Sequence, residues 1–139
     1  MATSNISISS ARLTTTGWQR TAVMLAAWVE IIVGASFVLA VDVQSQFVFG
    51  ATAEGAGALF ARLAGIGLIG LGLACLPSKL TGANLIAVRA LLAFNIAATI
   101  FFAWVGVATT LRGVMLWPVV ILHAGIAIAL ACVSLRMAE

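Results

Sequence analysis

Four stretches of the chain are almost continuously apolar and long enough to cross a lipid bilayer. A membrane-spanning helix needs about 20 apolar residues to cross a hydrocarbon core about 30 Å thick. The pattern predicts four spans, over residues 21–41, 58–76, 83–107 and 114–135. Lipid offers no hydrogen bonds to the backbone, so each span is expected to be a helix. With only short connections between them, the prediction is an all-α, up-down four-helix bundle.

Composition supports a protein that faces lipid. Of the 139 residues, 63% are hydrophobic and 8% are charged, whereas a soluble domain carries about 25% charged residues. So little charge cannot cover a water-facing surface, which makes the lipid bilayer the first expected partner. The seven basic residues are scattered singly along the chain. This distribution argues against a nucleic-acid-binding protein.

The polar segments predict one domain with a flexible tail. Residues 1–19 are rich in Ser and Thr and are expected to form a flexible cytoplasmic tail in front of a 20–139 membrane domain. Residues 42–57 are expected to form a connecting loop. Within it, Phe47 and Phe49 alternate with polar neighbours, which favours a short piece on the membrane surface.

Basic residues predict the orientation of the bundle. Four spans place the tail, the connection after residue 76 and the C-terminus on one side of the membrane. That side carries Arg12, Arg20, Lys79 and Arg136. The other carries Arg112, the two acids Asp42 and Glu54, and Arg62 just inside the second span. The positive-inside rule then predicts cytoplasmic N- and C-termini in a bacterial inner membrane.

Three spans each carry a polar residue at the same predicted depth. Glu30, Asn95 and His123 all lie about 15 Å or a little more from the cytoplasmic ends of their spans, at about 1.5 Å per helical residue. The three residues therefore form a candidate polar layer at the membrane midplane. Ala26, Ala27 and Gly34 lie near Glu30 on the helix and favour a packing face rather than a lipid face.

Two interpretations of this layer stay open. In the first, the three residues join helices: Glu30 is protonated and hydrogen-bonded, and His123 donates to a carbonyl that Pro118 leaves without its partner. In the second, they form a functional site, because ionisable residues inside a membrane often mark one. Arg62 either extends to the membrane surface or turns inward as an ion-pair partner of Glu30.

Glycine and proline predict two further features of the spans. Small residues occur on two faces of the second span, which favours it as the most enclosed helix. Pro118 is expected to kink the fourth span.

Spans two to four resemble small bacterial four-helix membrane proteins of the DoxX-like kind. The resemblance rests on RLAGIGLIGLGLACL, on the third span with Asn95, and on LWPVVILHA. Its particular positions are Arg62, Gly65, Gly72, Asn95 and the stretch from Trp117 and Pro118 to His123. The resemblance implies a four-helix bundle, and it assigns no catalytic residue.

The chemistry-bearing residues narrow the function classes. A single histidine, scattered carboxylates and two isolated cysteines predict no metal site, no haem and no thiol relay, so no cofactor is expected. The favoured function is a non-enzymatic bundle that serves as an accessory subunit of a larger membrane complex or forms a homo-oligomer. The alternative is a proton-coupled transporter, since Glu30 in AWVEIIVGAS is similar in position to the membrane glutamate of the small multidrug resistance family. An enzyme with Glu30 and His123 as an acid/base pair ranks last, because no nucleophile accompanies them.

Overall fold

The chain is all-helical wherever its structure is described. The computed structural model describes residues 17–77 and 84–138, and these contain five helices and no strand. Four helices are long and apolar enough to cross a membrane, which confirms the predicted all-α membrane bundle. The helices are α1 (Gly17–Leu39), α2 (Val41–Phe49), α3 (Gly55–Cys75), α4 (Leu85–Ala108) and α5 (Leu116–Ala138).

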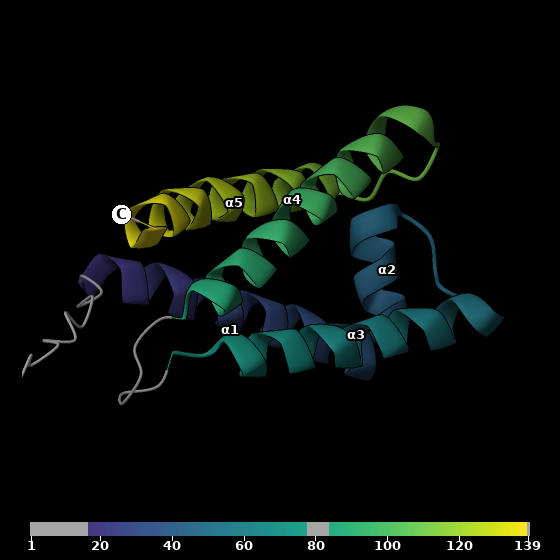
Figure 1. The fold of residues 1–139 in the computed structure, drawn as a ribbon. Coiled ribbons are helices and arrows are strands. Elements are labelled where there is room, and N and C mark those ends of the chain that lie inside the picture. Colours follow the sequence, from purple (N-terminus) through teal and green to yellow (C-terminus); the bar gives the residue numbers. More distant parts are fainter. Residues whose placement is uncertain (1–16, 78–83, 139) are drawn as a thin grey trace, which may run out of the picture.

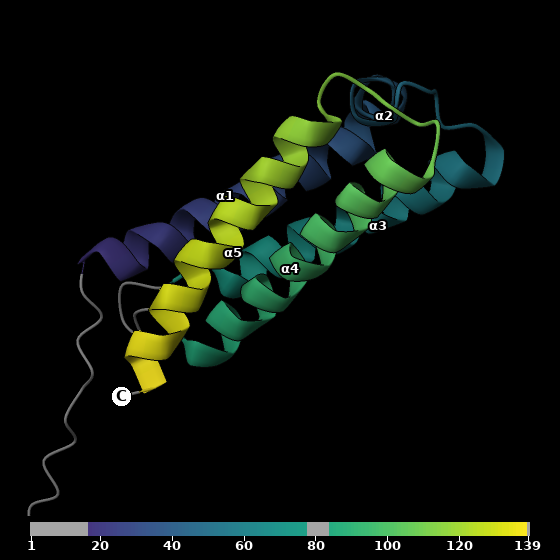
Figure 2. The same cartoon turned by 90° about the horizontal axis from the view of Figure 1, so that it is seen from above.

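The long helices form two layers that separate toward one end. Helices α1 and α3 pack closely as one antiparallel pair, and α4 and α5 as another. The two pairs approach each other near the described ends of the chain and splay apart toward α2, which stands between them (Figures 1 and 2). Near the chain ends, the Arg136 guanidinium carbon lies 5.6 Å from the centre of the Trp18 ring. This cation–π contact joins the start of α1 to the end of α5.

Each observed spanning helix begins and ends one to four residues from its predicted span, and the largest difference lies around the first connection. The first long helix begins at Gly17 and ends at Leu39, and a second helix, α2, occupies part of the predicted 42–57 loop. Helix α2 ends at Phe49 and is capped by Gly50, whose φ of 71° lies in the left-handed region that glycine adopts without strain. The rest of the predicted tail, residues 1–16, lies outside the described part of the chain.

Helices α1 and α3 touch backbone to backbone. A Cβ added at Gly65 would lie 2.6 Å from the Gly34 carbonyl oxygen, and one added at Gly72 would lie 2.6 Å from the Ala27 carbonyl oxygen. In lipid, such small residues permit the close approach that holds helices together. The seven-residue spacing within each helix brings both contacts onto one face of the pair.

Helix α3 is an outer helix, so the prediction that the second span is the most enclosed was wrong. Gly65, Gly72 and Cys75 are its buried residues, while Gly67 and Gly70 are exposed. One set of small residues packs on α1 as expected. The other set faces outward, and a Cβ at Gly67 or Gly70 would meet no atom within 4 Å. Small residues alone did not reveal which face had a partner within the chain.

Apolar clusters hold the layers together at both ends. The cluster near the chain ends joins α1, the end of α3, α4 and α5 through Val23, Ala26, Ala27, Cys75, Val88, Leu91, Leu130 and Val133. At the other end, a smaller cluster joins α2, α4 and α5 through Val48, Val105 and Leu116. The candidate polar residues lie between these two clusters.

Pro118 starts a helix rather than bending one. Helix α5 begins at Leu116, so Pro118 lies in its first turn. Backbone N–H groups of a first turn have no partner within the helix, and a proline there sacrifices no hydrogen bond. The predicted kink in the fourth span was therefore wrong.

The connection before α5 is tied to α2 by two backbone hydrogen bonds. The N–H of Gly113 donates to the Val48 carbonyl at 3.1 Å, and the N–H of Met115 donates to the Phe47 carbonyl at 2.9 Å. A Cβ at Gly113 would collide with the Phe47 carbonyl. We expect Gly113→Ala to separate this connection from α2 and to raise amide exchange in residues 113–115, measured by hydrogen–deuterium exchange. Gly57→Ala is the control, because its Cβ would meet no atom within 4 Å. Unchanged protection at 113–115 would contradict the prediction.

A buried polar chain as candidate functional site

Glu30, Asn95 and His123 come together between the two layers as a hydrogen-bonded chain. The side-chain nitrogen Nδ2 of Asn95 donates to Glu30 Oε1 at 3.0 Å. On its other side, Asn95 Oδ1 lies 2.8 Å from His123 Nδ1. Glu30 and Asn95 are completely buried, and His123 is almost so. The polar chain therefore joins one layer, through α1, to both helices of the other.

The hydrogen bonds of Asn95 define the histidine tautomer. Besides Glu30, its Nδ2 donates to the Leu91 carbonyl at 2.9 Å, so both amide hydrogens have acceptors. This leaves Oδ1 as the acceptor that faces His123. The Nδ1 of His123 must carry the proton that the contact requires. The polar chain thus has one direction, from His123 as donor through Asn95 to Glu30 as acceptor.

Apolar and aromatic side chains surround Glu30 and His123. Val23, Ala26, Ala27 and Gly34, all buried, surround Glu30 along its helix face. The His123 ring is stacked on Phe102 at 5.8 Å between ring centres, and the Phe94 ring meets it edge-on at 6.1 Å. The predicted bond from His123 to a carbonyl freed by Pro118 was wrong, because its Nδ1 contacts Asn95 instead.

One carboxyl oxygen of Glu30 lacks a partner. Oε2 is buried and accepts no hydrogen bond from the described residues. Oε1 accepts a hydrogen bond from the neutral amide of Asn95. An isolated carboxylate is strongly disfavoured in a hydrocarbon environment, and the protonated form lowers this cost. The hydrogen bonds of the polar chain therefore fit a neutral Glu30 side chain better than an ionised one.

Arg62 does not pair with Glu30. It is exposed, and the described residues include no ion pair between the two. Gly34 faces Gly65 and Ala27 faces Gly72, so Glu30 lies at the level of about Ile69 on α3. Arg62 lies seven residues away from that level, about 10 Å along the helix. The exposed position of Arg62 avoids the cost of burying its charge.

Two apolar cavities lie between the layers, and neither is lined by a member of the polar chain. One, of about 680 Å³, lies between α3 and α4, and the other, of about 520 Å³, lies between α1 and α5. Neither is lined by Glu30, Asn95 or His123. The described residues also contain no group of three His, Cys, Asp or Glu side chains that could hold a metal ion. This arrangement can hold helices together and can store a proton, but it presents no polar surface to a substrate.

Phe94 and Phe102 were not anticipated from the sequence. They are eight residues apart, so they share one face of α4 and together enclose His123. The sequence does show the eight-residue spacing of the two phenylalanines. That spacing did not identify them as neighbours of His123, because aromatic residues are common in apolar spans. Only the crossing of α4 and α5 shows that this face meets the histidine.

Comparisons with protein-family models, with curated proteins and with solved structures find no match for the chain. The site is therefore interpreted from its own residues and contacts.

Proposed function

We propose that this protein is a non-enzymatic multi-pass membrane bundle that serves as an accessory subunit or self-assembles in the membrane. The observation that carries the proposal is the Glu30–Asn95–His123 chain, which joins the two layers while none of its members lines either of the two cavities. A polar chain with this placement acts as an interhelical tie. Hydrogen bonds of this kind fix the register of helices that lack a hydrophobic driving force for association in lipid.

The outer side of α3 supports association with another helix. Gly70 is exposed there, with open space beside its Cα. Helices that pack in lipid place small residues at their contacts. A second copy of the chain or a partner subunit would bury surface that this chain leaves open.

Charge at the two ends supports an inner-membrane location with cytoplasmic termini. Arg20, Arg89 and Arg136 lie at the end of the bundle where α1 begins and α5 ends, whereas the α2 end carries Arg112 together with the acids Asp42 and Glu54. The positive-inside rule assigns the first end to the cytoplasm. The four-helix architecture is also compatible with kinship to DoxX-like proteins, which we retain as part of the proposal.

Purification in a mild detergent tests the proposal. We expect native mass spectrometry to show a homo-oligomer, or a stable complex with another membrane protein. A lone monomer with nothing co-purifying, reproduced in lipid nanodiscs, would overturn it.

One observation favours a second candidate, a proton-coupled transporter. Glu30 Oε2 is buried without a partner, and a proton on this carboxyl group has no competing acceptor among the described residues. Protonation and release at Glu30 could accompany transport if the layers separated and admitted water. The two layers lie farthest apart near α2 (Figure 1), which supports an opening that begins at that end.

Glu30→Gln separates the two candidates. For an interhelical tie, we expect Glu30→Gln to lose about 1 kcal/mol or less, since the amide oxygen still accepts from Asn95 and the amide nitrogen replaces an oxygen that already lacks a partner. Proteoliposomes of parent and variant should then show the same proton flux under an imposed pH gradient. Proton flux in the parent that disappears in Glu30→Gln would favour the transporter instead.

A further inference from the structure

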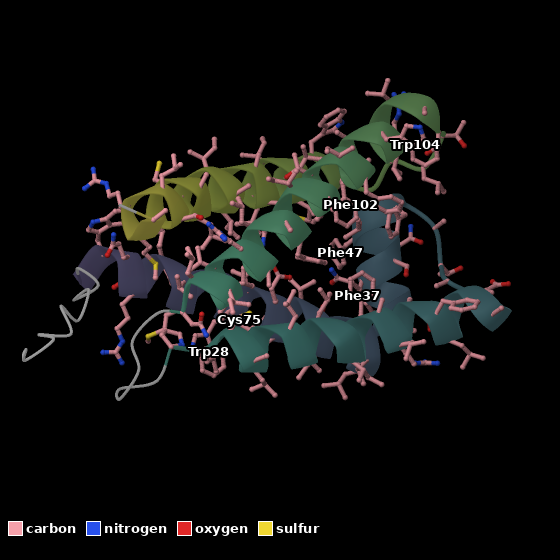
Figure 3. The ribbon with its side chains drawn as sticks, in the orientation of Figure 1. Trp28, Phe37, Phe47, Cys75, Phe102 and Trp104 are labelled. Atoms are coloured by element: carbon pink, nitrogen blue, oxygen red, sulfur yellow. The ribbon has the colours of Figure 1, made fainter. Side chains whose placement is uncertain are left out.

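The cavity between α3 and α4 forms a lateral groove with an entirely apolar lining. Its volume is about 680 Å³, and its lining runs along α3 from Ala61 to Leu71 and along α4 from Phe94 to Phe102. Figure 3 shows Phe37 and Phe102 on facing sides of this space. The lining residues are Phe37, Phe49, Ala61, Ala64, Gly67, Leu68, Leu71, Phe94, Ala97, Ala98, Phe101 and Phe102.

The groove is bounded along the helices and open to the side. Toward the chain ends, α3 meets α4 where Cys75 Sγ contacts the Ala87 carbonyl at 3.6 Å. Toward α2, Phe49 closes the wide end and lies 6.0 Å from the ring centre of Phe102. Gly67, Ala97 and Phe101 line the groove and remain exposed, so its side opens outward between two spanning helices. In a bilayer this opening faces the hydrocarbon layer.

The size of the groove excludes a helix from another subunit as its occupant. A helix about 10 Å across occupies about 400 Å³ for each turn of 5.4 Å. The groove would therefore hold fewer than two turns, whereas its volume lies within the range of about 300–1,000 Å³ that is typical of small-ligand sites.

The lining selects a hydrocarbon chain among the ligands of that size. A non-helical peptide would leave backbone groups without hydrogen bonds. A quinone or sterol head would likewise find no polar side chain in the lining to contact. An acyl chain has no such requirement and can enter sideways from the bilayer.

A cation at the α2 end of the groove indicates which headgroup the bound acyl chain carries. Arg112 is exposed, and its backbone packs beside Gly50, the residue that follows Phe49. An arginine at a membrane surface is well suited to a phosphodiester, which it can contact with two parallel N–H donors. We propose that the groove holds one acyl chain of a membrane phospholipid, whose phosphate lies near Arg112.

Gly67→Leu and Gly70→Leu form a matched pair that tests this site. Both glycines lie on α3, and a Cβ at either position meets no atom within 4 Å, but only Gly67 lines the groove. The protein is purified, incubated with palmitoyl-oleoyl phosphatidylglycerol and examined by native mass spectrometry. We expect the parent and Gly70→Leu to retain one phospholipid, Gly67→Leu to lose it, and Arg112→Gln to retain it less well.

Each contrary result would overturn the assignment. A parent protein without bound phospholipid, or equal retention in Gly67→Leu and Gly70→Leu, would show that the groove is not the site. A bound isoprenoid lipid, or retention unchanged in Arg112→Gln, would show that a phospholipid phosphate is not recognised there. The same spectra report the mass of the assembly, so failure of the proposed function is detected separately from failure of the lipid site.

Discussion

Asn95→Leu is expected to destabilise the bundle by about 3 kcal/mol, because it removes the central member of the polar chain. Glu30 Oε1 loses its donor and His123 Nδ1 loses its acceptor. Each buried polar group left without a partner costs about 1–3 kcal/mol. Single interhelical hydrogen bonds in membranes average about 0.6 kcal/mol where other partners can replace them. Apolar packing around Glu30 and His123 leaves no such replacement here, which favours the larger effect.

Unfolding in SDS titrations, followed by circular dichroism, would measure this loss. Thr99→Val is the matched control, since the Thr99 hydroxyl donates to the Asn95 backbone carbonyl within the same helix. Removing the Thr99 hydroxyl leaves the polar chain intact and is expected to change the free energy of unfolding by about 0.5 kcal/mol or less. If Asn95→Leu and Thr99→Val unfolded at the same SDS concentration, the polar chain would not be joining the layers.

A triple replacement distinguishes lost bonds from disturbed packing. Glu30→Leu, Asn95→Leu and His123→Phe together remove every polar member of the chain, so no buried group is left without a partner. Replacing all partners by apolar groups of similar shape is often close to neutral. We therefore expect the triple variant to regain most of the stability that Asn95→Leu loses. A triple variant as unstable as the single one would mean that side-chain shape, rather than hydrogen bonding, accounts for the effect.

The sequence predicted the helices and the depth of the polar residues because both depend on spacing along one chain. Apolar runs of sufficient length specify spanning helices, and the equal depths of Glu30, Asn95 and His123 follow from the helical rise. Which atoms meet depends on how the helices rotate about their axes. That rotation determined that Asn95 lies between the other two, and it was not available from spacing alone.

The expectations for Arg62, Pro118 and α3 were wrong because they too depended on how the helices begin and pack. Arg62 was a candidate partner for Glu30 because both are charged residues inside neighbouring spans, but the register set by Gly34 and Gly65 places them at different levels. Pro118 was expected to bend a helix because the apolar run begins before it, although the helix itself begins at Leu116. The outward face of α3 was misjudged because small residues mark a close contact without identifying a partner.

Gly72→Ala is expected to destabilise the contact between α1 and α3 by up to about 3 kcal/mol, the upper part of the usual range for overpacking. The new methyl carbon would lie 2.6 Å from the Ala27 carbonyl oxygen and 2.6 Å from Ile31 Cγ1. A backbone carbonyl cannot rotate away, so the two helices must separate along their closest contact. Separation would also shift Glu30, which lies on α1 between Ala27 and Gly34, away from Asn95.

Gly70→Ala provides the matched comparison for this effect. It makes the same chemical change in the same helix, but its added methyl group meets no atom within 4 Å. Since alanine favours a helix over glycine by about 1 kcal/mol, Gly70→Ala should leave stability unchanged or slightly raised. Thermal unfolding of the two variants in detergent would separate them by several degrees if the backbone contact at Gly72 holds the pair together. Equal melting temperatures would show that α1 and α3 can adjust their distance freely, and the tie between the layers would then depend on the polar chain and the end clusters alone.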